Sequence, residues 1–253
     1  MSDSGNKGER EVLALEIDTA DGPLRGMFAV PPRPMRLPEL AFGFLDISSK
    51  LTDLAVAREV REGREISCRK GCGACCRQVV PLSPPEAWLV ADLVAGMPPA
   101  RQVEVRAAFA AASQTLEESG VKAALSARME SVDQMLAAAL GYFQLGIACP
   151  FLRDESCSIH PYRPSICREY MVTSPAENCA TLGKGPITRI PVHLRLSEAF
   201  TNLTAKLLGT EPEVVPMTLA LEWAEQHRDE GRRTWSARTL IEGLVAELSA
   251  RPA

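Results

Sequence analysis

Eight cysteines are the residues of this 253-residue chain whose type and spacing are best suited to chemistry. Four form a cluster with the spacing C-x3-C-x2-C-C, at Cys68, Cys72, Cys75 and Cys76, and four follow later, at Cys149, Cys157, Cys167 and Cys179. Thiolates bind zinc and hold iron–sulfur clusters. Because the chain has three histidines, sulfur dominates any ligand set. The pattern predicts a metal centre held by the first cluster and completed by the later cysteines.

The adjacent Cys75 and Cys76 favour a centre with more than one metal ion. Neighbouring side chains of extended backbone point to opposite faces, so such a pair either serves two metals or bends to reach one polynuclear cluster. Gly71 and Gly73, between the cysteines, let the backbone bend closely around a metal. Eight thiolates can supply two four-thiolate sites, or one such site with four cysteines in other roles. The spacing leaves both arrangements open.

Basic residues accompany both cysteine groups. Four thiolates around Zn²⁺ or a [4Fe–4S]²⁺ core leave a net charge of about −2, which calls for nearby cations or amide donors. Arg163 and Arg168 lie within the second group. We expect both to compensate the charge of a bound metal or cluster and to donate to sulfur.

The composition favours a cytoplasmic protein. The net charge of −4 gives no reason to expect nucleic-acid or anionic-membrane partners. The N-terminus has no apolar run behind its basic residues, so no secretory signal is expected, and the longest apolar stretch (135–149) is too short to span a bilayer. In a reducing compartment, clustered cysteines bind metal or catalyse more often than they form disulfides. The expected partners are metal ions, with a protein partner left open.

The pattern of apolar residues predicts a mainly α fold. A small β-hairpin is expected around Asp21-Gly22, and a proline-rich linker follows at 31–38. Helices are expected over 39–62, 84–96, after Pro99, and over 121–143, 197–208, 215–228 and 236–248, with the loop-rich metal region between them. Ser83 and Glu86, at capping-box spacing, mark the start of the helix over 84–96. The apolar stripe of 121–143 is interpreted as core packing. We divide the chain into a hairpin and linker (1–36) and a helical cysteine-cluster domain (37–253).

The segments CRKGCGACC, CPFL and CSIHPYRPSICREY together resemble the YkgJ-type CxxxCxxCC cysteine-cluster family, described as zinc- or iron-chelating. The resemblance spans about residues 64–172. Its pattern matches at Cys68, Cys72, Cys75, Cys76, Cys149, Cys157, Arg163, Pro164, Cys167 and Arg168. Cys179 lies outside this core pattern. The family often has tyrosine where this chain has His160, so packing or hydrogen bonding is favoured over ligation for that histidine.

The resemblance implies a metal centre and leaves the reaction open, so no catalytic residue is identified. The first hypothesis is an iron–sulfur protein, with a [4Fe–4S] cluster that is redox-active or supports a transfer reaction. The second is a zinc module with a structural, interaction or metal-handling role. The flagellin lysine N-methylases are distantly similar, which adds a lysine methylase-like enzyme that uses S-adenosylmethionine, although the sequence holds no nucleotide-binding signature of its own. A thiol or disulfide protein without metal is the remaining reading.

Overall fold

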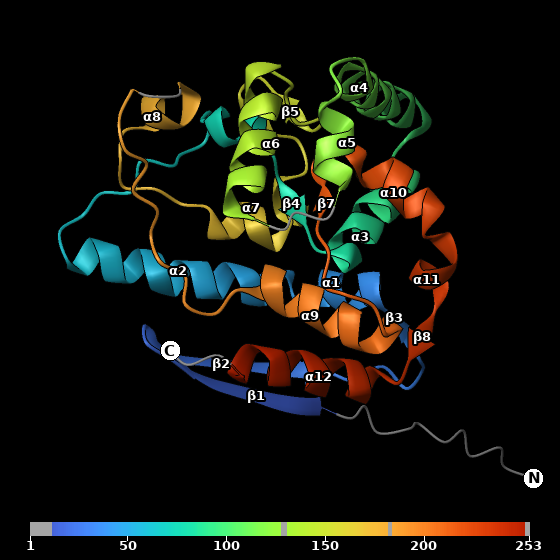
Figure 1. Ribbon diagram of the computed structural model, residues 1–253. Helices are drawn as coiled ribbons and strands as arrows, with labels where there is room; N and C mark the ends of the chain where they lie inside the picture. The colour runs from blue at the N-terminus through green and yellow to red at the C-terminus, as the bar shows by residue number, and fades with distance from the viewer. Residues whose placement is uncertain (1–11, 128–130, 182–183, 251–253) are drawn as a thin grey trace, which may run out of the picture.

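The computed structural model describes residues 12–127, 131–181 and 184–250, and it confirms a mainly α fold (Figure 1). Residues 1–11, on which the expected absence of a secretory signal depends, lie outside this range. The helices of the described residues are α1 (Leu37–Gly43), α2 (Leu45–Arg61), α3 (Pro84–Ala95), α4 (Pro99–Glu118), α5 (Val121–Ser126), α6 (Val132–Gln144), α7 (Ser165–Glu169), α8 (Ala176–Ala180), α9 (Leu196–Leu208), α10 (Ala220–Gln226), α11 (Arg228–Arg232) and α12 (Ala237–Ser249).

The strands of the described residues form antiparallel pairs. The predicted hairpin is present as β1 (Val12–Thr19) and β2 (Gly22–Ala29), with Gly22 in the turn at a φ of 121°. The other pairs are β3 (Met35–Arg36) with β8 (Thr234–Trp235), β4 (Pro81–Leu82) with β7 (Val215–Pro216), and β5 (Leu152–Arg153) with β6 (Ser156–Cys157). Short 3₁₀ helices are η1 (Ala74–Arg77), η2 (His160–Tyr162) and η3 (Met217–Leu219).

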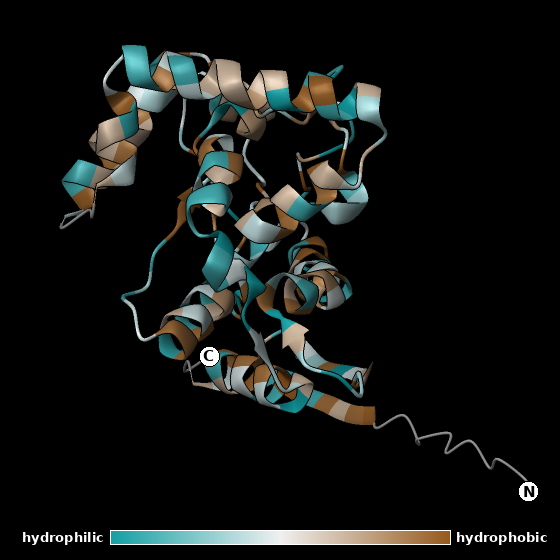
Figure 2. Ribbon diagram, turned by 90° about the vertical axis from the view of Figure 1, so that its right-hand side faces the viewer, coloured by the Kyte–Doolittle hydropathy of each residue, from teal (hydrophilic) through white to brown (hydrophobic). Residues whose placement is uncertain are grey.

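Two apolar cores position the cysteine segments. The larger core packs the hairpin against α1, α2, α3, α9 and α12. The second core packs α3 and α4 against β4, β7 and the segment that follows Cys149, and both Cys149 and Cys157 pack against it. In Figure 2, hydrophobic and hydrophilic residues alternate along the helices, as expected where one face of a helix packs on a core and the other faces solvent. The cysteine segments therefore rest on a helical scaffold.

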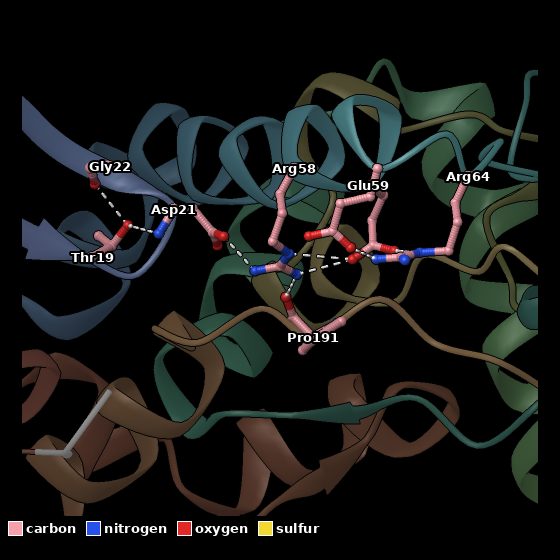
Figure 3. A network of polar contacts seen from close by, with 8 residues as sticks. Thr19, Asp21, Gly22, Arg58, Glu59, Arg64 and Pro191 are labelled. Carbon is pink, nitrogen blue, oxygen red and sulfur yellow. Dashed lines mark hydrogen bonds and ion pairs between the residues drawn. The ribbon is translucent and has the colours of Figure 1, made fainter.

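Charged contacts also fix the hairpin to the helices (Figure 3). The Arg58 guanidinium, near the end of α2, pairs with the Asp21 carboxylate in the hairpin turn and donates to the Pro191 carbonyl at 2.6 Å. Glu59, the next residue, pairs with Arg58 and with Arg64, which leads into the first cysteine segment. One network thus connects the hairpin to the start of that segment. The proposed division of the chain at residue 36 stays a prediction.

The predicted helix over 121–143 is two helices, α5 and α6, and its stripe is only partly core. Ala127 is extended, and the Ser131 side chain begins α6 by accepting a hydrogen bond from the Gln134 backbone N–H at 3.2 Å. The break changes which side chains face inward, because it interrupts the helical periodicity. Val132, Leu136 and Leu140 are exposed, so the core interpretation is wrong for them, while Met129 lies outside the described residues.

Candidate metal centre

The first cysteine segment folds as a tight loop between α2 and β4. The Cys72 N–H donates to the Arg69 carbonyl at 3.1 Å, and Gly71 has a φ of 87°, a conformation that side chains other than glycine rarely adopt. Cys75 and Cys76 follow within η1. The loop predicted from the two glycines is therefore present, and it carries all four clustered cysteines.

Gly73 lets this loop approach the second cysteine segment. A Cβ atom at position 73 would lie 2.5 Å from Glu155 Oε2 and 2.9 Å from Leu152 Cδ1. Glu155 in turn forms an ion pair with Arg77 of η1, with its carboxylate oxygens 2.5 and 2.9 Å from the guanidinium nitrogens. A side chain at position 73 would therefore displace the ends of the Glu155 and Leu152 side chains, which now lie close to the loop.

Cys149 lies just before the β5–β6 hairpin and Cys157 lies on β6, and this segment contacts η1. The Cys149 N–H donates to the Cys76 carbonyl at 2.7 Å, and Cys157 pairs with Leu152 across the hairpin. Two segments that are distant in sequence are joined at this point by backbone. Cys149 therefore contacts the first cysteine segment, while the completion of one ligand set by the later cysteines stays a prediction.

Cys167 lies on α7, whose first turn is held by Glu86 of α3. Glu86 is 1% exposed, and its Oε1 accepts a hydrogen bond from the Ser165 backbone N–H at 2.5 Å. Its Oε2 accepts from the Ser83 backbone N–H at 3.4 Å, as in the capping box of α3, and from the Ser83 hydroxyl at 2.7 Å. One buried carboxylate therefore begins two helices. The sequence identified Glu86 as a cap of α3 and missed its contact with α7.

Arg168 and Glu169 hold α7 against the other helices. Arg168 donates to the carbonyls of Arg163 and Pro161 at 2.9 and 2.8 Å and to the Ser49 hydroxyl of α2 at 2.6 Å. Glu169 accepts from the Ser197 N–H and hydroxyl at the start of α9 at 3.1 and 2.5 Å. The contact of Glu169 with α9 was not predicted from the sequence. Its signal there was a charged residue close after Cys167.

The two arginines therefore do different things. Arg168 is buried and its side chain is committed to protein oxygen atoms, so the structure gives it the role of holding the backbone. The Arg163 Nε is buried without a hydrogen-bond partner among the described residues. Burial raises the pKa values of the Cys68, Cys157 and Cys167 thiols, and the positive charge of Arg163 partly offsets this rise. Arg163 therefore lies near these cysteines with a guanidinium nitrogen that is free to donate.

Cys179, outside the family's core pattern, lies beside the first cluster. It is 4% exposed, and its helix α8 packs against η1. The Gln78 side-chain amide, just after η1, donates to the Cys179 carbonyl at 3.0 Å. The structure therefore brings all eight cysteines to one region. His160 is exposed in η2, where the charge of Arg163 and partial burial lower the pKa of the imidazole.

The surroundings favour neutral thiols unless a cation is bound. Burial raises the pKa of Cys149 to about 12 and that of Cys167 well above its usual value. A hydrogen bond with the Cys76 thiol, together with burial, raises the pKa of Cys75. Metal ions bind thiolates and displace these protons. Metal binding here is therefore coupled to proton release.

The donor set fits a thiophilic metal or cluster, and the unpaired Arg163 Nε offers a donor for its negative charge. The side chains are not arranged for ligation, however. Among the described residues, no three of the Cys, His, Asp and Glu side chains converge closely enough to hold one metal ion. Since the backbone segments are already together, ligation calls for thiol groups to turn toward one another.

Residues 67–184 match the CxxCxxCC family, described as a "putative zinc- or iron-chelating domain". This match confirms the resemblance seen in the sequence. The matched segment contains all eight cysteines, Cys179 included. Searches of curated proteins and of solved structures found no match to the chain. Among the helices of the part of the chain described here, none combines the length and apolar character that a membrane crossing requires.

Proposed function

We propose that this protein binds iron as an iron–sulfur cluster of the [4Fe–4S] type, with thiolate ligands drawn from its eight cysteines, in the cytoplasm. The observation that supports this most is the gathering of eight free cysteines in one region, together with the Arg163 Nε, which is buried and has no hydrogen-bond partner among the described residues. All-thiolate ligation suits iron–sulfur clusters, and burial of the sulfurs in a cationic setting tunes their potential.

Arg163 has a defined task in this proposal. When bound, the cluster supplies electron transfer or activates a substrate for a transfer reaction. The Arg163 guanidinium would offset the excess negative charge of the thiolates, because its Nε has no acceptor among the residues that the structure describes. Arg168 would support the cluster indirectly, because it fixes the backbone that precedes Cys167.

A zinc module is the second candidate function. It is favoured by the position of the cysteines, which join segments from both halves of the helical scaffold at η1, β5 and β6. A closed four-thiolate zinc site would staple these segments and would need no open coordination position. A lysine methylase-like reaction has less support, because the sequence holds no nucleotide-binding signature that would indicate a site for S-adenosylmethionine.

The experiment that separates these functions is anaerobic purification, followed by iron, sulfide and zinc analysis and a visible spectrum of the same sample. The proposal predicts iron and acid-labile sulfide with absorbance at about 400 nm. A colourless protein with stoichiometric zinc would instead establish the second candidate. Protein that retains neither metal under anaerobic conditions would contradict both.

A further inference from the structure

We infer that the cavity between α4, α5 and α10 is a binding site for an organic anion with an apolar body (Figure 1). The cavity has a volume of about 700 Å³, which is within the range of small-molecule binding sites. The inference goes beyond the proposed metal centre and does not depend on it, because none of the eight cysteines lines this cavity.

One face of α4 forms a wall of the cavity. Arg106, Phe109 and Ser113 recur at intervals of three and four residues, so they lie on the same side of the helix. Phe109 is 4% exposed and, together with Leu221 of α10, gives the cavity an apolar inner surface. Contact with this surface would remove the apolar body of a ligand from water.

The acidic side chains that line the cavity already have donors in the protein. The Lys122 ammonium of α5 pairs with Glu222 at 2.9 Å and with Glu117 at 3.3 Å. The Gln114 side-chain amide donates to the Glu118 carboxylate at 2.8 Å. The three carboxylates are therefore engaged within the protein, and the charge of Lys122 is shared between two of them.

Arg106, in contrast, carries a charge that has no partner among the described residues. Its side chain lines the cavity, is exposed, and forms no ion pair or hydrogen bond with the part of the chain that the structure describes. The guanidinium stays protonated and presents a planar set of donors that suits a carboxylate, sulfonate or phosphate group. An anionic group at Arg106, with an apolar body along Phe109 and Leu221, is therefore the ligand that the cavity fits best.

The buried side of the cavity holds an unpaired hydroxyl. Thr218 lines the cavity and is 3% exposed, and its Oγ1 has no hydrogen-bond partner among the described residues. The Tyr142 phenol lies close by but not in hydrogen-bond geometry with it. Because buried hydroxyls are rarely left unsatisfied, a polar group of a ligand that reaches Thr218 would complete its hydrogen bonding.

Phe109 also connects the cavity to the cysteine region. Its ring packs edge to face on Phe151, with ring centroids 5.5 Å apart. Phe151 follows Cys149 closely in the chain, and both belong to the same apolar core. One layer of aromatic rings therefore separates a ligand in the cavity from this cysteine segment.

The first test titrates anilinonaphthalene sulfonate, an apolar anion whose fluorescence rises in an apolar site, into the full chain as purified. The inference predicts saturable binding. Octanoate should displace the probe, whereas octylamine, which has the same chain length and the opposite charge, should not. Displacement by octylamine, either alone or to the same degree as by octanoate, would overturn the inference, and so would the absence of saturable binding.

Two variants locate the bound probe. Arg106→Gln should weaken binding by about tenfold, because a charge-assisted hydrogen bond is lost. Ala110→Phe should abolish binding, because Ala110 is exposed and lines the cavity, so that the added ring would fill it. The matched controls are Arg61→Gln on α2 and Ala111→Phe on α4, since both residues are exposed and lie outside the cavity lining.

Circular dichroism checks that each variant keeps its helices, which we expect because the replaced residues are exposed. Wild-type affinity in folded Arg106→Gln and Ala110→Phe would show that the probe binds elsewhere, for instance at the exposed apolar residues of α6, and would overturn the inference. The probe is measured without reference to metal content. Failure of this inference is therefore distinguishable from failure of the proposed metal centre.

Discussion

The backbone N–H of Cys149 donates a hydrogen bond to the carbonyl of Cys76 at 2.7 Å, and this contact joins the two cysteine segments of the chain. It is made by main-chain atoms, so it leaves both thiols available as ligands. The Arg77–Glu155 ion pair and the close approach of Gly73 lie beside it. Protein contacts therefore bring the ligands together, and metal binding has to reorient side chains over short distances.

Gly73→Ala should weaken this junction. The added methyl group would meet Glu155 Oε2 and Leu152 Cδ1, so the ends of these side chains would have to shift and the Arg77–Glu155 ion pair would be disturbed. We therefore expect a lower metal content and a slightly lower Tm. Gly43→Ala is the matched control, because a Cβ atom there meets nothing within 4 Å and its φ is not positive. Equal metal content and Tm in the two variants would show that the junction does not need Gly73.

Glu86→Gln should loosen α7 and with it Cys167. A glutamine side chain has one accepting oxygen, and its other terminal group is an NH₂ donor. Either the Ser165 N–H or the Ser83 hydroxyl would then face this NH₂ group and lose its acceptor. An unsatisfied buried group of this kind costs about 1–3 kcal/mol. Urea denaturation measures the loss, with the exposed Glu213→Gln as control. If both variants unfold at the same urea concentration, Glu86 does not hold α7.

Arg163→Gln and Arg168→Gln should separate metal retention from folding. Arg168 makes three hydrogen bonds to protein oxygens, so its replacement should lower the free energy of unfolding of the metal-free protein by about 1–3 kcal/mol. Arg163 leaves its Nε unpaired, so its replacement should leave that free energy nearly unchanged and speed the loss of metal to a chelator. If Arg163→Gln lowered the free energy of unfolding while Arg168→Gln only sped the loss of metal, the roles given to the two arginines would be wrong.

Glu59 should contribute to stability at neutral pH and lose its effect in acid (Figure 3). Hydrogen bonds from Arg64 and Arg58 lower the pKa of the Glu59 carboxyl below its usual value. The stabilisation is therefore complete above the unfolded-state pKa of about 4.3 and is lost as the pH falls through the lower folded-state pKa. Glu59→Gln should destabilise the protein at pH about 7, and the difference from wild type should shrink toward pH about 3.

Urea titrations at the two pH values measure this difference. Glu16→Gln is the control, because its ion pair with Arg25 lies on the exposed hairpin surface and contributes little. A Glu59→Gln effect that stays constant, or that grows in acid, would contradict the role of the ion pairs.

The sequence predicted the elements whose local signals are strong. The hairpin follows from Asp21-Gly22, and the start of α3 follows from Ser83 and Glu86 at capping-box spacing. The spacing of Cys68 to Cys76 and its glycines predicted a tight loop, which the structure contains. These features depend on residues close in sequence, and so they can be derived without tertiary contacts.

The features that sequence reasoning missed depend on contacts between distant segments. Arg163 and Arg168 occur in the same RPxxCR motif. No neighbouring residue indicates that Arg168 bonds to Ser49 while the Arg163 Nε has no partner among the described residues. The exposed face of α6 was read as core because its periodicity continues that of α5, and only the break before Ser131 separates them. The position of Cys179 beside η1 likewise follows from the packing of α8.

The central claim, that these cysteines bind a metal, is tested most directly by the metal content per chain of Cys72→Ser/Cys75→Ser. The exposed Val103→Ser on α4 serves as control. Both proteins are purified anaerobically beside the wild type, and iron and zinc are measured in the same samples. The account predicts that the double variant loses most of the metal while the control retains the wild-type amount. Wild-type loading in the double variant would contradict the assignment of the cysteine cluster as the metal centre.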